Sequence, residues 1–239
     1  MGDKIIIMLD NHTEIFGNLC NFTDRFNELK IYSKELAKII EDETLKYVSD
    51  QEQYDIKTEE FDRKFHFVND TFKRNLRTSI IVSLVTIMEN ELHQFCNMMK
   101  RINNINIKHN TFKGTILEQF KIYINDVVDL RFELSKNNWK LINEIIELRN
   151  CIVHHDSNLE DWYGRKFAKI EVIRNLSQAI PSIIIDEKSS NIILDDGSCN
   201  ECITVVQSFF DNLYKHTLLL YPKANSTSNI FNENNSLDF

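Results

Sequence analysis

Glycine and proline, the residues that most often interrupt helices, are scarce in this chain. Its 239 residues include 5 glycines and 2 prolines. Because both residues mark turns or end helices, their scarcity argues against a fold with many tight loops. Hydrophobic residues make up 42% of the chain, an ordinary share for a globular protein with a core. We therefore expect long helices packed on a core.

Long apolar runs are also absent. The longest, residues 80–88, is well below the roughly 20 residues of a transmembrane helix, and Ser83 and Thr86 interrupt it. Residues 5–9 are too few for the apolar part of a secretory signal peptide, and no cleavage site follows them. We expect a cytoplasmic protein with no membrane partner.

The cysteines are few, odd in number and scattered. They are Cys20, Cys96, Cys151, Cys199 and Cys202. Without a secretory leader, this pattern indicates reduced cytoplasmic thiols. Cys199 and Cys202 form a C-x-x-C, a spacing found in zinc and redox sites. A structural zinc needs four ligands, however, and no second pair follows at finger spacing. Buried thiols are therefore favoured, and we expect no metal.

Positive charge is in deficit, with a formal net charge of −8 at pH 7 and an isoelectric point near 5.4. Proteins that bind nucleic acids without sequence preference usually carry a net positive charge. Any contact with RNA must therefore be local, through a restricted basic patch on an acidic surface. The chain also lacks a G-x-x-x-x-G-K-[ST] phosphate loop, an H-E-x-x-H zinc motif, a G-x-S-x-G nucleophile elbow and the polymerase-type nucleotidyltransferase motif. We expect no cofactor.

Apolar residues recur at helical spacing through most of the chain. The pattern predicts helices over residues 3–50, with a break near Tyr32 and Ser33, and then over residues 61–99, 111–134, 139–155 and 165–180. Ser198 and Glu201 have the spacing of a capping box before a final helix. Two β-rich runs, residues 182–185 and 191–194, predict a hairpin. The predicted fold is all-α, a mainly helical bundle with a small β-hairpin near residues 182–195.

Composition divides the chain into three parts. Residues 1–60 are predicted to form an N-terminal helical extension that ends in a polar, acidic stretch. Residues 61–221 would form the main helical domain with the hairpin as an insert. Residues 222–239 are rich in asparagine and serine, and we expect them to be disordered. His109, in the polar stretch 102–110, is expected to be an exposed loop residue.

Residues 139–157, WKLINEIIELRNCIVHHDS, carry the main candidate for chemistry. An apolar stripe at steps of four, three and four anchors this helix to a core; it consists of Leu141, Ile145, Leu148 and Ile152. Arg149, Asn150 and His154 follow in the last turns. Histidine titrates near neutral pH, and the planar guanidinium of arginine matches phosphate oxygens. Such a pair can cleave RNA without a metal, because RNA supplies its own nucleophile, the ribose 2′-hydroxyl.

The helical geometry separates the two groups. Residues five apart lie roughly 140° apart around the axis and about 7.5 Å apart along it, so Arg149 and His154 flank a face. A second copy across a two-fold axis would complete the site, with His154 as acid or base and Arg149 as phosphate clamp. We therefore expect a homodimer across this helix, with RNA as substrate.

At these residues the chain resembles the HEPN superfamily of α-helical domains, many of which are ribonucleases in toxin–antitoxin, phage-defence and RNA-processing systems. The family signature is an arginine, usually followed by a polar residue, and then a histidine near the helix end; Arg149, Asn150 and His154 match it. A weaker resemblance extends to SIIVSLVTIMENELHQFC, where Glu89 stands at a position that is acidic in many members.

The resemblance covers roughly residues 70–215 and implies a metal-independent endoribonuclease that leaves 2′,3′-cyclic phosphate ends. It implies that Arg149 and His154 are catalytic, that Asn150 supports them and that Glu89 orients Arg149. From the residues alone, Glu89 is equally well explained as a surface glutamate. Family toxins paired with a nucleotidyltransferase antitoxin usually have a tyrosine two positions after the histidine. Asp156 stands there, which argues against that particular pairing.

Six further residues are candidates for RNA contacts. They are Lys73, Arg77, His155, Trp162, Arg165 and Lys166. Lys73 and Arg77 share a helix face, and an aromatic ring such as Trp162 can stack on an unpaired base. The same residues are also explained by ordinary solvated charge and by a tryptophan that covers the core.

A second interpretation comes from a different class. The chain would be a non-catalytic helical module that binds a partner protein, such as an antitoxin or a defence-system subunit. The acidic net charge favours it, and the motif would then be a capping arginine with surface histidines. Burial of His154 under Trp162 would favour this module, whereas two symmetric copies of Arg149 and His154 facing one cleft would favour the nuclease.

Overall fold

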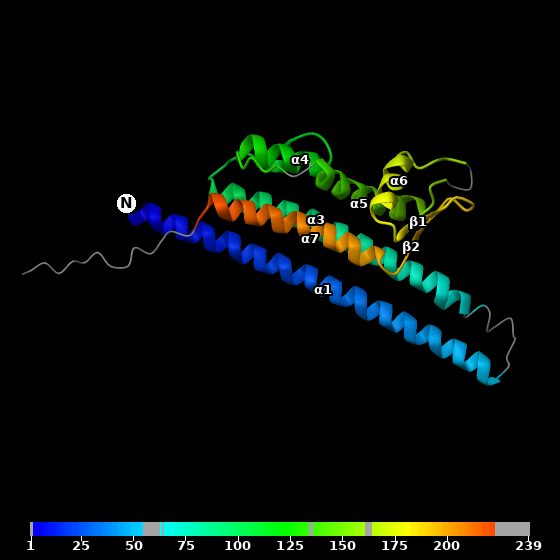
Figure 1. Cartoon of the computed structure of the whole chain (residues 1–239). Coiled ribbons are helices and arrows are strands. Elements are labelled where there is room, and N and C mark those ends of the chain that lie inside the picture. Colours follow the sequence, from blue (N-terminus) through cyan, green and yellow to red (C-terminus); the bar gives the residue numbers. More distant parts are fainter. Residues whose placement is uncertain (1, 55–62, 64, 134–135, 161–163, 223–239) are drawn as a thin grey trace, which may run out of the picture.

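The computed structural model describes residues 2–54, 63, 65–133, 136–160 and 164–222, and these form an all-α fold with one small antiparallel hairpin (Figure 1). The predicted fold class is confirmed. The helices are α1 (Gly2–Tyr54), α3 (Lys73–Ile102), α4 (Ile116–Ile122), α5 (Lys136–His155), α6 (Ile170–Ala179) and α7 (Ser198–Leu220). The strands are β1 (Ile183–Asp186) and β2 (Asn191–Leu194), paired in register from Ile183 with Leu194 to Asp186 with Asn191.

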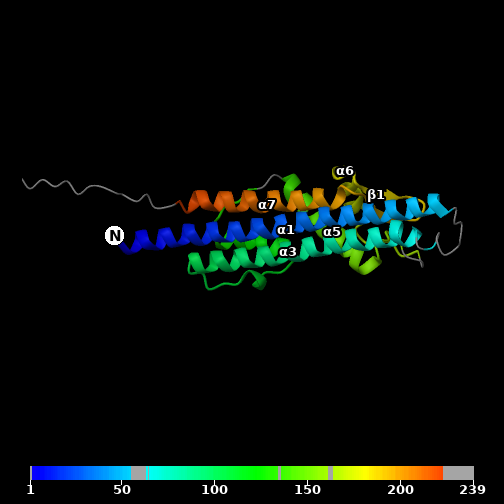
Figure 2. The same cartoon turned by 90° about the horizontal axis from the view of Figure 1, so that it is seen from below.

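The four long helices form a bundle. Helix α1 packs against both α3 and α7, and α5 packs against the same pair from the opposite side, as the two views show (Figures 1 and 2). Helices α3 and α5 also contact each other directly. The hairpin and α6 lie at the C-terminal end of α5. Within the described residues, no helix has both the length and the apolar character to cross a bilayer.

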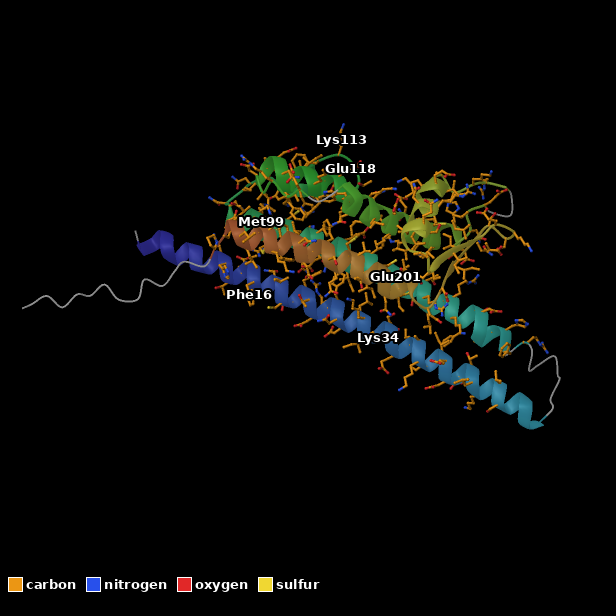
Figure 3. All side chains as sticks on the ribbon, viewed as in Figure 1. Phe16, Lys34, Met99, Lys113, Glu118 and Glu201 are labelled. Carbon is orange, nitrogen blue, oxygen red and sulfur yellow. The ribbon has the colours of Figure 1, made fainter. Side chains whose placement is uncertain are left out.

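Helix α1 is one continuous helix, so the predicted break near Tyr32 and Ser33 is wrong. Ser33 is buried and lies between Leu29 and Leu36 on the stripe that faces the core, so the helical period continues through it. The opposite face is exposed, as Phe16 and Lys34 show (Figure 3).

The buried side of α1 belongs to the same core as α3 and α7. The ring of Phe22 lies 4.9 Å from that of Phe210 and 5.9 Å from that of Tyr214. The predicted boundary between residues 60 and 61 lies outside the described residues, as does the tail from residue 223 onward, so both stay predictions.

Local details around α4 and α7 differ from the expectations. The helix predicted over 111–134 is shorter, because α4 ends at Ile122 and a π-helical turn, Tyr123–Val127, follows it. The capping box predicted at Ser198 is wrong, since the Ser198 hydroxyl donates to the Asp195 carbonyl at 2.7 Å. A capping box forms instead at the start of α4, between Thr115, which precedes the helix, and Glu118 in its first turn.

His109 is buried, which corrects its assignment as an exposed loop residue. It lies in a short 3-10 turn, His109–Thr111, and its Nε2 atom is 3.1 Å from Nδ1 of His93 on α3. Burial lowers the pKa of His109, and the neighbouring His93 lowers it further. Burial therefore favours the neutral form of His109, which attaches this loop to α3 through its contact with His93.

A buried carboxylate joins three of the four long helices. Glu91 on α3 is 1% exposed, forms an ion pair with Arg25 on α1, and accepts a hydrogen bond from the Tyr214 hydroxyl on α7 at 2.9 Å. Burial raises the pKa of Glu91, while Tyr214 and Arg25 act in the opposite direction. A buried charge is tolerated only when it is paired and hydrogen-bonded, so these two partners stabilise the carboxylate between the helices.

Removing one partner of Glu91 should be costly. We expect Arg25→Met to lower the free energy of unfolding by about 2 kcal/mol, because it leaves a buried carboxylate without its cation. The double variant Arg25→Met/Glu91→Gln should recover most of this loss, since glutamine still accepts from Tyr214. Urea denaturation followed by circular dichroism measures both.

The matched control is Arg101→Met. Arg101 pairs with Glu14 between the same two helices, but its side chain is 62% exposed. We expect a loss below about 1 kcal/mol for this exposed pair. Equal losses for Arg25→Met and Arg101→Met would contradict a special role for the buried carboxylate.

Candidate functional site

The core-facing side of α5 determines where its polar residues point. Ile145, Leu148 and Cys151 are fully buried, whereas Leu141 and Ile152 are half-buried. This packing leaves Arg149 and Asn150 half-buried and His154 exposed at the C-terminal end of the helix.

Arg149 is held by two acceptors. Its Nη2 lies 3.4 Å from a carboxylate oxygen of Glu89 on α3, and its Nη1 donates to the Asn150 side-chain oxygen at 3.1 Å. The Arg149 and Glu89 side chains are 24% and 30% exposed, so the pair lies at the edge of the core within reach of solvent. The structure thus brings together Arg149, Asn150 and Glu89, and the contact with Glu89 is the one that the resemblance to the HEPN superfamily implies.

The network continues to a residue with no predicted role. The Asn150 amide donates to Glu147 at 3.3 Å, and Glu147 forms an ion pair with Lys169, just before α6. Glu147 is 5% exposed, so Lys169 and Asn150 compensate its buried charge. A signal for Glu147 exists in the sequence: with Asn150 and His154 it has the spacing of one helix face, three and then four residues apart.

His154 lies in an open cleft of about 700 Å³. The cleft is lined by Val153, His154, His155, Asp156, Arg165 and Lys166. Among the described residues the His154 imidazole has no hydrogen-bond partner, and Lys166 has no ion pair. The predicted RNA-contact residues Arg165 and Lys166 are therefore brought next to His154.

Two other residues predicted to contact RNA, His155 and Trp162, give less support to that role. The His155 ring packs edge-on against Phe167, with centroids 5.1 Å apart, so it is partly engaged in packing. Trp162 lies outside the described residues.

Arg149 and His154 do not share one cleft within a single chain. Arg149 faces Glu89 on α3 and is not among the residues that line the His154 cleft. Asn150 lies between the Arg149–Glu89 pair and the His154 cleft. It binds the Arg149 guanidinium and precedes His154 by about one helical turn.

A second cleft of about 530 Å³ adjoins the first. Lys73, Arg74 and Arg77 at the start of α3 form one wall, and residues of the hairpin form another. Asp156 lines both clefts. Arg77 has a structural role here, since it donates to the Leu194 carbonyl at 2.6 Å and forms an ion pair with Asp196.

The β-hairpin fixes the end of α5. Asp156 and Ser157 have φ angles of 49° and 64°, a left-handed conformation that costs roughly 1 kcal/mol or more per residue outside glycine. The Ser157 carbonyl accepts from the Ile192 amide at 2.9 Å, and the Leu159 amide donates to the Ser190 carbonyl at 2.8 Å. These bonds maintain the turn that positions His154 and Asp156.

Cysteines and potential metal ligands are other reactive groups within the described residues. All five cysteines are free; four are buried, and burial raises the pKa of the Cys151 thiol to about 12, which keeps it protonated. No cluster of histidine, cysteine, aspartate and glutamate in the described ranges has the arrangement of a metal site.

Glu144, one turn before Leu148, carries a poorly compensated charge. It is 2% exposed, one of its carboxylate oxygens has no hydrogen-bond partner, and Lys140 lies 3.5 Å away. Burial raises the pKa of Glu144, with Lys140 acting in the opposite direction. The folded state therefore favours the protonated carboxyl, and stability is lost as the pH rises through the folded-state pKa.

We expect Glu144→Gln to raise the free energy of unfolding by about 1 kcal/mol at pH 7, because the amide removes a buried, undersatisfied charge. The difference should shrink as the pH falls toward about 4, where the unfolded-state glutamate also becomes protonated. Urea denaturation at both pH values measures it. The exposed Glu41→Gln serves as control, and a Glu144→Gln variant that is less stable at pH 7 would contradict the prediction.

Comparisons of the chain with models of known protein families, with curated proteins and with solved structures found no match. The resemblance to the HEPN superfamily therefore rests on the α5 motif and on Glu89. Chemically, the end of α5 offers a solvent-accessible imidazole beside cationic side chains and a guanidinium oriented by a carboxylate.

Proposed function

We propose that the chain is a metal-independent endoribonuclease of the HEPN type with its site at the C-terminal end of α5. One observation carries this proposal: the His154 imidazole is exposed, has no partner among the described residues and lies in a cleft with Arg165 and Lys166. Histidine is the side chain most often used as a general acid or base, and the cationic side chains match the phosphates of RNA.

The reaction needs only proton transfer and charge stabilisation. His154 accepts the proton of the ribose 2′-hydroxyl, the 2′-oxygen attacks the neighbouring phosphorus, and the bond to the 5′-oxygen breaks. The leaving 5′-oxygen takes up a proton from water, and His154 returns its proton to the solvent. The products are a 2′,3′-cyclic phosphate and a free 5′-hydroxyl. Arg149 stabilises the negative charge on the phosphate during the transfer.

The proposal includes a homodimer. Within one chain the two groups point about 140° apart, so a phosphate near His154 would meet Arg149 of a second copy across a two-fold axis. Glu89 and Asn150 each hold one nitrogen of the guanidinium, which limits its motion before RNA binds. A substrate phosphate would then compete with Glu89 for the same nitrogen.

The proposed setting is a toxin–antitoxin or phage-defence system in the cytoplasm, where a separate antitoxin or regulatory subunit would control the nuclease. The five free cysteines fit a reducing compartment.

The alternative function is a non-catalytic helical module that binds a partner protein. One observation favours it: Arg149 already pairs with Glu89 and does not line the His154 cleft. In that case the Arg149–Glu89 pair would simply connect α5 to α3.

Cleavage of RNA in the presence of EDTA tests the proposal. We expect the purified chain to cut single-stranded RNA and to leave 2′,3′-cyclic phosphate ends. His154→Ala and Arg149→Ala should each lower the rate roughly a hundredfold or more, the usual scale for loss of an acid–base group. His66→Ala is the matched control, since His66 is exposed and does not line the His154 cleft. Full cleavage by a folded His154→Ala variant would rule out the proposed role of His154.

Mixing inactive variants tests the shared site. Arg149→Ala and His154→Ala chains, allowed to exchange subunits, should regain up to about a quarter of wild-type activity, because half of the dimers would have one intact pair of groups. Each variant mixed with itself is the control. If the mixture of Arg149→Ala and His154→Ala chains recovers no cleavage activity, a site built from two chains is contradicted.

A further inference from the structure

The second cleft has opposite chemical character on its two walls. On the α3 wall, Arg74 is exposed and has no hydrogen bond or ion pair among the described residues, and Lys73 lies beside it. On the other wall, the side-chain amide of Asn191 and the carboxylate of Asp156 likewise have no partner within the described part of the chain.

The formal charges that line this cleft balance. Its cations are Lys73, Arg74 and Arg77, and its carboxylates are Asp70, Asp156 and Asp186. The cleft as a whole therefore offers little net electrostatic attraction to a simple anion. A ligand that carries an anionic end and a hydrogen-bonding end suits it better, because each end meets the matching wall.

A nucleotide has these two ends. Its phosphate matches Lys73 and Arg74, while amide and carboxylate groups such as those of Asn191 and Asp156 hydrogen-bond the edge of an unpaired base. The cleft volume of about 530 Å³ lies in the range of sites that hold molecules of this size.

We propose that the second cleft binds the RNA nucleotide next to the scissile linkage, with Arg74 and Lys73 at its phosphate and Asn191 and Asp156 at its base. This inference rests on the proposed nuclease function. Asp156 carries the connection, because it lines both clefts and so places a nucleotide in the second cleft beside the phosphate at His154. The two residues at the base would then determine which nucleotide is preferred.

Binding of labelled ten-nucleotide RNAs to the full-length His154→Ala chain, measured by fluorescence anisotropy in EDTA, tests the phosphate contact. We expect Arg74→Glu to weaken binding at least tenfold. Lys34→Glu makes the same charge change on the exposed face of α1 and should leave binding within about twofold, since it acts only through the long-range field. Equal weakening by both variants would overturn the inference.

The base contact is tested by comparing RNAs that differ in one nucleotide. We expect Asn191→Ala and Asp156→Asn to reduce the discrimination among the four bases at least threefold. Asparagine at position 156 tolerates the left-handed backbone as well as aspartate does, so the turn is kept. Unchanged discrimination in both variants would overturn the inference.

The two proposals can fail separately. If RNA binding depends on Arg74 but the wild-type chain does not cleave RNA, the proposed nuclease function is wrong and the proposed nucleotide site still stands. If cleavage depends on His154, but Arg74→Glu and Asn191→Ala change neither RNA binding nor base preference, only the proposed nucleotide site is wrong.

Discussion

The site depends on how the C-terminal end of α5 is held. Two backbone hydrogen bonds connect the residues that follow this helix to the β-hairpin, and they maintain Asp156 and Ser157 in left-handed conformations. Arg77 in turn binds the hairpin to α3 through the Leu194 carbonyl and Asp196. Helix α3, the hairpin and α5 thus form a closed frame, and without it the last turn of α5 would be free to fray. The hairpin is small, but its bonds to Ser157 and Leu159 hold the turn that directly follows His154 and His155.

Glu89 and Glu91 on α3 have different roles. They point in nearly opposite directions because a helix turns about 200° over two residues. Glu91 faces the interior, where Arg25 and Tyr214 satisfy it and connect α1 to α7. Glu89 faces α5 at the edge of the core, where it pairs with Arg149. One carboxylate therefore contributes to the stability of the bundle, while the other orients a cation that solvent can reach. In the proposed nuclease, these roles separate folding from catalysis.

Prediction from sequence succeeded where the information is local. The helical period located the long helices, and the alternation of β-rich runs with a polar turn located the hairpin. It failed at Ser33, where a polar residue was taken as a break although it fills a position on the buried stripe. It also failed at His109, because its burial depends on His93, sixteen residues earlier on another element. Glu147 went unrecognised since its partner Lys169 lies in a separate segment.

The amino-acid sequence alone determined the all-α architecture and the placement of Arg149, Asn150 and His154 near one helix end, because both follow from residue spacing along a helix. The tertiary structure decided which charges are paired and which stay open. It assigned Arg77 to the hairpin, placed Arg165 and Lys166 beside His154, and brought the start of α3 next to Asp156. These outcomes depend on segments that are distant in sequence and meet only when the bundle packs, so no local pattern encodes them.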